Sequence, residues 1–160
     1  MIPLTTEHDS VGELDRRAGG IASRMLERTL PKPEWTHEAH VLACIAIVRD
    51  RGAAEALAML RTAIPRYNEA TAVANTPTSG YHDTITVYYV WAVDRLLRAG
   101  LDAAAILADP TIEREGPLQW WERDELMSER ARRSWLAPTR VPAGWDPAER
   151  GPHQFDVPPR

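Results

Sequence analysis

One stretch of sequence decides the fold: Trp35-Thr36-His37-Glu38-Ala39-His40, followed by the apolar run from Val41 to Val48. A helix drawn through this stretch is apolar nearly all round, which is typical of a helix that is buried on every side. The two long helices that we expect after it each keep one apolar face and a polar back. The pattern therefore predicts an all-α antiparallel bundle in which this helix is central.

Glycines and prolines divide the chain into four main helices and several short ones. The long helices are predicted over residues 12–29, 33–51, 53–74 and 80–99, and short ones over 102–108 and 129–136. Trp120 and Trp121 are expected to dock on the bundle, and Ser128 to cap the last helix. We expect residues 1–137 to form one domain. Residues 138–160, with six prolines in 23 residues, are expected to form an extended tail.

Composition excludes several classes of function. The 160 residues carry a net charge of −4, so nothing favours nucleic acid as a partner. No apolar run approaches the ~20 residues of a membrane span, and the N-terminus lacks the pattern of a secretory signal. Cys44 is the only cysteine, which suggests a reducing, cytoplasmic location. Lys32 is the only lysine, and there is no nucleophile elbow or glycine-rich phosphate loop.

Three of the five histidines lie in two short motifs, Trp35 to His40 and Gly80-Tyr81-His82-Asp83-Thr84. At 100° per residue, His37 and His40 share a stripe with core residues of the central helix. His82 shares the inward stripe of the fourth helix with Thr86, whereas Thr84 is predicted to face outward. Because the second and fourth helices should run parallel, their first turns lie at one end of the bundle. We therefore expect His37, His40 and His82 to converge on one divalent metal ion, zinc fitting best and iron, nickel, manganese or copper also possible.

Other polar residues near these motifs complete the predicted site. Water, Glu34 or Asp83 is expected as the fourth ligand, and Glu38, Tyr81 or Asp83 as the group that assists proton transfer. The substrate is expected to be small and anionic, because two helix N-termini point towards the site. Substrate-binding roles are predicted for three further residues, Asn68, Arg61 and Tyr67. Arg61 has an alternative role as a salt bridge to a neighbouring helix.

These motifs resemble a family of bacterial all-helical proteins with no established activity. The resemblance is carried by Thr29-Leu30-Pro31-Lys32, Trp35-Thr36-His37-x-Ala39-His40, Tyr67-Asn68 and Asn75-Thr76-x-Thr78-Ser79-Gly80-Tyr81-His82-Asp83-Thr84-Ile85-Thr86, and more weakly by residues 123–132 and Trp135. It covers most of residues 29–136 and implies one coherent site. Such relatives often carry glutamate at the position of Asp83.

Three functions follow from this pattern. The first is a small metal-dependent enzyme, or metal-binding protein, that acts on a small anionic molecule. The second is a metal-free pocket in which the histidines bind a ligand or transfer protons. The third is a structural or partner-binding helical module whose histidines are satisfied by hydrogen bonds. The sequence specifies neither the substrate nor the oligomeric state.

Overall fold

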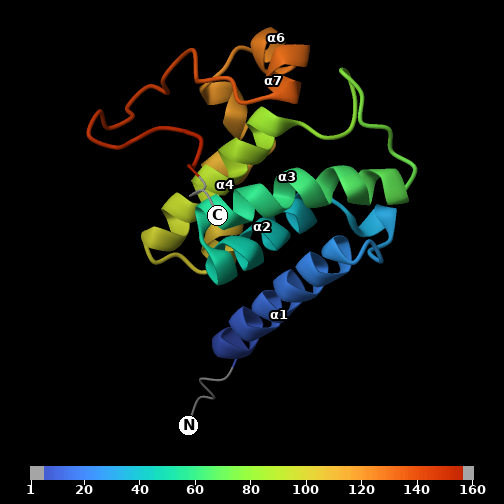
Figure 1. The fold of residues 1–160 in the computed structure, drawn as a ribbon. Helices are drawn as coiled ribbons and strands as arrows, with labels where there is room; N and C mark the ends of the chain where they lie inside the picture. Colours follow the sequence, from blue (N-terminus) through green and yellow to red (C-terminus); the bar gives the residue numbers. More distant parts are fainter. Residues whose placement is uncertain (1–5, 157–160) are drawn as a thin grey trace.

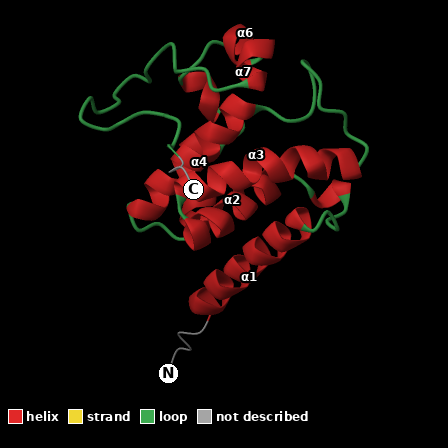
Figure 2. Cartoon of the chain, viewed as in Figure 1, coloured by secondary structure: helices red, strands yellow, loops and turns green. Residues whose placement is uncertain are grey.

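The computed structural model of the chain describes residues 6–156, and over that range it contains helices and no strand, as predicted (Figures 1 and 2). The four long helices are α1 (Thr6–Leu26), α2 (His37–Arg51), α3 (Ala53–Ala70) and α4 (Asp83–Arg98). A 3₁₀ turn, η1 (Lys32–Glu34), precedes α2. The short elements after α4 are α5 (Ala103–Leu107), η2 (Pro110–Ile112), η3 (Gly116–Gln119), α6 (Arg123–Leu126) and α7 (Glu129–Arg133).

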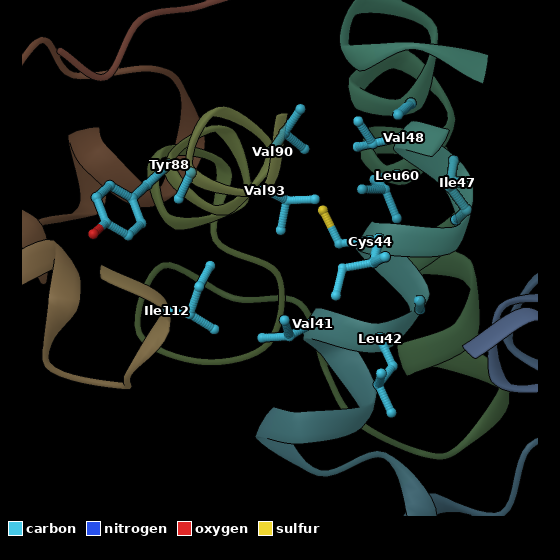
Figure 3. Packing of buried hydrophobic residues seen from close by; sticks show 14 of the residues in the cluster. Val41, Leu42, Cys44, Ile47, Val48, Leu60, Tyr88, Val90, Val93 and Ile112 are labelled. Carbon is cyan, nitrogen blue, oxygen red and sulfur yellow. The ribbon is translucent and has the colours of Figure 1, made fainter. Parts of the chain in front are cut away.

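Helix α2 is central, as its apolar surface predicts. It packs against α1, α3, α4 and α5. Every residue from Val41 to Ile45 is buried, and so are Ile47 and Val48. Figure 3 shows Cys44 of α2 pointing towards Val93 of α4 across this core. Burial on all sides removes apolar surface from water, and this is the main source of the stability of the fold.

Helix α4 begins later than predicted, at Asp83 rather than at Gly80. His82 has an extended backbone conformation, and its Nδ1 accepts a hydrogen bond from the Ile85 N–H at 3.2 Å. It is therefore the N-cap of the helix and not part of the first turn. The helical-wheel position predicted for its side chain does not apply, because the residue is outside the helix.

The segment after α5 folds back over the start of α4, where α6 and α7 lie in Figure 1. Trp120 and Trp121 are buried and Ser128 caps α7, as predicted. Thr84, predicted to face outward, is instead fully buried. Its hydroxyl donates to the Ser134 carbonyl at 3.1 Å and accepts from the Leu136 N–H at 3.0 Å. The prediction was wrong because this later segment covers the back of α4.

The described part of the tail, residues 138–156, returns to the helices (red in Figure 1). The Trp145 ring lies 5.8 Å from Trp91 and 4.9 Å from Trp120, and the Trp91 indole N–H donates to the Arg150 carbonyl at 3.3 Å. The tail is thus held on the domain surface by aromatic packing. None of the helices within residues 6–156 is long and apolar enough to cross a membrane.

Candidate functional site

Two adjoining pockets form a cleft beside the first turns of α2 and α4. They share five lining residues: Trp35, His40, Ile64, Ile85 and Thr86. One, of about 370 Å³, is completed by His37, Val41, Cys44, Leu60, Tyr89 and Arg114, and we call it the Arg114 pocket. The other, of about 490 Å³, includes Lys32, Tyr67, Asn68, Tyr81, His82 and Arg132, and we call it the Arg132 pocket. Both volumes are ordinary for small-molecule sites.

His37, the first residue of α2, anchors one wall of the cleft. Its Nε2 donates to the Ile112 carbonyl at 2.8 Å, and its ring lies 5.4 Å from that of Tyr89. The Tyr89 hydroxyl donates to the Glu113 carbonyl at 2.8 Å. Together these two bonds hold the segment that follows η2, so that Arg114 lines the pocket. Among the described residues, Nδ1 of His37 has no hydrogen-bond partner.

His40 lies between the two pockets. Its Nδ1 donates to the Thr36 carbonyl at 2.6 Å, which leaves Nε2 as the hydrogen-bond acceptor of the ring. The ring stacks on Trp35 with a centroid distance of 3.7 Å, and its other side is exposed to solvent in the cleft. Desolvation by the surrounding protein is the largest cause that lowers the pKa of His40 from 6.5 to about 4, and the positive charge of Arg114 adds to this effect. His40 is therefore neutral at neutral pH.

His82 is only 8% exposed, and both of its ring nitrogens are used by the protein. Nε2 donates to the Leu126 carbonyl at 2.7 Å, while Nδ1 accepts from Ile85. Burial is the largest cause of the lowering of its pKa, and the charge of Arg132 contributes. In this neutral form the ring has no free lone pair to offer a metal ion.

The predicted convergence of three histidines is therefore not found. Among the residues whose side chains the structure describes, 11–156, no group of three histidines, cysteines, aspartates or glutamates could hold a metal ion. His37 and His40 line the Arg114 pocket together, whereas the His82 ring is bonded to α6 and to its own helix. The first turns of α2 and α4 do lie beside the same cleft, as expected. The His82 ring, however, is hydrogen-bonded to the Leu126 carbonyl and so does not join the other two histidines.

The predicted carboxylates lie elsewhere. Glu34 pairs with Arg24 at 3.0 Å and Glu38 with Arg17 at 2.6 Å, both on exposed surface and away from the cleft lining. The first pair ties η1 to α1, and the second ties the first turn of α2 to α1. Glu38 is therefore not placed to act on a ligand in the cleft, and Glu34 is not placed as a fourth ligand.

Asp83 is buried in an ion pair. Arg61 donates two hydrogen bonds to its carboxylate, at 2.9 and 3.0 Å, and the Tyr81 hydroxyl donates a third at 2.8 Å. Burial and the charge of Asp83 raise the pKa of Tyr81. Of the two roles expected for Arg61, the salt bridge between helices is the one found. All three side chains are committed to one another rather than open to a substrate.

Tyr67 and Asn68 line the Arg132 pocket, yet their polar atoms hold the protein together. The Tyr67 hydroxyl donates to the Leu30 carbonyl at 3.0 Å. Asn68 donates to the side-chain oxygen of Asn75 at 3.0 Å, and the same oxygen accepts the Tyr81 N–H. These bonds fix the loop between α3 and α4, so both residues shape the pocket wall.

Sequence reasoning missed the two arginines after which the pockets are named. Arg114 follows η2 in an irregular segment, where no periodicity marks it. Arg132 is in α7, and its Nη1 donates to the carbonyls of Gly80 and Tyr81, at 3.1 and 3.4 Å. Only the docking of both segments onto α4 brings the two side chains to the cleft. The Trp35 stack was also missed, although the motif contains the residue.

All the charged side chains that line the cleft are positively charged. Its charged lining residues are Arg114, Lys32 and Arg132, and neither aspartate nor glutamate lines either pocket. None of the three cations has a carboxylate within 4 Å among the described residues. Cys44 at the pocket wall stays protonated, because burial raises the pKa of its thiol to about 12. The cleft is thus cationic and partly apolar, and its thiol is unreactive.

Comparisons with known proteins give no match: no family model, no curated protein and no solved structure matches this chain. The fold and the site together define an all-α protein with a cationic, aromatic-walled cleft beside its central helix. The resemblance drawn from the motifs stays a prediction.

Proposed function

We propose that the protein binds a small organic anion in this cleft. The observation that carries the proposal is the lining itself, where the charged side chains are all cations in a chain whose net charge is −4. A cluster of cations without carboxylate partners repels itself, and a bound anion relieves that repulsion. The arrangement therefore favours negative ligands over neutral and positive ones.

The two kinds of lining suggest how the ligand lies. Arg114 offers a planar fork of N–H donors, which matches the two oxygens of a carboxylate. Trp35, Ile64 and Ile85 supply the apolar wall against which the carbon part of the ligand packs. His40, held flat by Trp35, accepts a hydrogen bond at Nε2 when the ligand carries a hydroxyl or N–H group.

Binding is better supported than proton transfer. A general base is most effective when its pKa lies near the working pH. The pKa of His40, lowered to about 4, makes it a weak base at neutral pH, although it remains a good hydrogen-bond acceptor. Glu38, Tyr81 and Asp83, expected to assist proton transfer, are engaged in ion pairs or hydrogen bonds.

The test is calorimetric titration of the protein with octanoate, a carboxylate with an apolar chain. We expect saturable binding that Arg114→Gln weakens about tenfold or more, which corresponds to the loss of one charged hydrogen-bond pair. Arg130→Gln, an exposed arginine outside the cleft, should leave the affinity unchanged. Equal affinity in the wild type and Arg114→Gln, or no binding to either, would contradict the proposal.

A second candidate is a divalent metal ion held by His37 and His40 alone. Its support is that Nδ1 of His37 and Nε2 of His40 have no protein partner among the described residues, and that both rings line the Arg114 pocket. Titration with zinc alone tests it. Stoichiometric binding that both His37→Gln and His40→Gln abolish would support this site, and zinc binding that neither substitution changes would contradict it.

A further inference from the structure

We propose that the ligand is a dicarboxylate, with one carboxylate at Arg114 and the second at Arg132 and Lys32 in the other pocket. This inference rests on the proposed function and specifies its ligand class. The two pockets share the Trp35–His40 stack and the side chains of Ile64, Ile85 and Thr86. A single molecule can therefore extend from one pocket into the other, with its apolar middle on the shared wall.

The state of Arg132 points to a missing anion. Its Nε is buried and has no hydrogen-bond partner, although its Nη1 donates to two carbonyls. A buried N–H without an acceptor is costly, and a partly buried guanidinium normally has a carboxylate partner. Among the described residues no carboxylate lies within 4 Å of it, although Glu129 and Arg133 of the same helix pair with each other. A ligand carboxylate in the pocket cannot reach the buried Nε, but beside the guanidinium it supplies the missing charge.

Lys32 adds a second positive charge to the Arg132 pocket. It lies in η1, is exposed, lines the Arg132 pocket and has no carboxylate within 4 Å among the residues described. Arg132 is held in place by the loop before α4, whereas Lys32 is free to approach an anion from the side of α2. Together they place two cations at one end of the cleft, opposite the single Arg114.

The charged side chains that line the cleft suit a carboxylate at both ends. Phosphates are commonly bound by free backbone N–H groups at a helix N-terminus. Here the Ala39 N–H at the start of α2 is taken by the Thr36 hydroxyl, and the Ile85 N–H of α4 by His82. Each cap occupies one N–H group of its helix, and the charged donors that line the cleft are guanidinium and ammonium groups. A planar guanidinium fits a planar carboxylate through two parallel bonds.

Suberate and octanoate provide a matched pair of probes, because they have the same number of carbons and differ in the second carboxylate. We expect suberate to bind the wild type about tenfold or more tightly than octanoate, as for one added charged contact. Arg132→Gln should reduce the affinity for suberate to that for octanoate and leave octanoate unchanged. Lys32→Gln should weaken suberate several-fold, and Arg130→Gln should affect neither probe.

The controls separate the two proposals. Because Arg132 also holds the loop at Gly80, thermal unfolding of Arg132→Gln is measured in parallel, and Lys32→Gln repeats the test at an exposed residue without that role. If octanoate binds through Arg114 while suberate is no tighter, the dicarboxylate inference is wrong and the proposed function stands. If neither probe binds, both proposals are wrong.

Discussion

Replacing His82 is predicted to destabilise the fold through two separable contacts. In His82→Ala the Ile85 N–H loses its cap, which typically costs about 1 kcal/mol. The buried Leu126 carbonyl loses its donor, which costs a further ~1–3 kcal/mol. The expected total is about 2–4 kcal/mol of unfolding free energy. His82→Asn keeps a capping oxygen but is too short to reach Leu126, so it should cost about 1 kcal/mol less than His82→Ala.

Urea unfolding followed by tryptophan fluorescence measures this series, with EDTA present throughout. His153→Ala is the matched control, because the His153 ring contacts the Gly151 carbonyl and the Phe155 ring, both within two residues of it, and the substitution should cost less than ~1 kcal/mol. The reasoning is refuted if His82→Ala unfolds like the wild type in EDTA. It is equally refuted if EDTA alone destabilises the wild type as much as the substitution does, since His82 would then be stabilised by a metal ion.

Three further predictions concern other parts of the site. Asp83→Asn removes the buried charge that pairs with Arg61. It should lower the unfolding free energy in urea by about 2–3 kcal/mol, both with and without octanoate. A variant that is as stable as the wild type but no longer binds octanoate would contradict this and give Asp83 a role in binding. The pKa of His40 is lowered to about 4 and that of His82 is lowered too, so the unfolded chain binds more protons than the folded chain as the pH falls below 6.5. The unfolding free energy contributed by these two histidines should therefore be fully present above pH 6.5 and decrease towards pH 4. The decrease should be shallower in His40→Gln than in the wild type, and equal slopes for the two proteins would contradict this. Gly116→Ala places a Cβ against the Thr111 carbonyl oxygen, so it should cost ~1–3 kcal/mol and weaken octanoate binding by displacing Arg114. Gly20→Ala in α1 meets nothing within 4 Å and should be neutral or stabilising.

The features predicted correctly from the sequence are local ones. The burial of α2 follows from its composition. The Ser128 cap and the end of α2 at Arg51 follow from short patterns of capping and breaking residues, whereas α5 ends at Leu107, one residue before its predicted end at Ala108. These signals depend on residues a few positions apart, so a single sequence contains them. The all-α fold follows from the same periodicity.

The features predicted wrongly depend on contacts between distant segments. The start of α4 was predicted three residues too early. His82, predicted inside the helix as a metal ligand, is therefore its N-cap, because helix boundaries depend on more than the local pattern. Thr84 is buried because residues 134–136 pack on it, some fifty positions away. Arg114 and Arg132 line the cleft because their segments pack against α4, which is far from them in the sequence. Nothing within their own segments indicates it.

The motif histidines have three different roles in this account. His37 holds the segment that carries Arg114, and His82 holds the segment that leads to Arg132. His40 lines both pockets, with its ring stacked on Trp35. The motif histidines thus help to assemble the cleft from distant segments of the chain.

The most direct test is an NMR titration of the histidine side chains with and without octanoate, in EDTA. The account predicts that His40 titrates well below 6.5 in the free protein, and that octanoate raises its pKa, because the ligand's charge offsets that of Arg114. His82 should keep its proton on Nε2 in both states. If octanoate leaves the His40 titration unchanged, the cleft is not the anion site and the central claim is wrong.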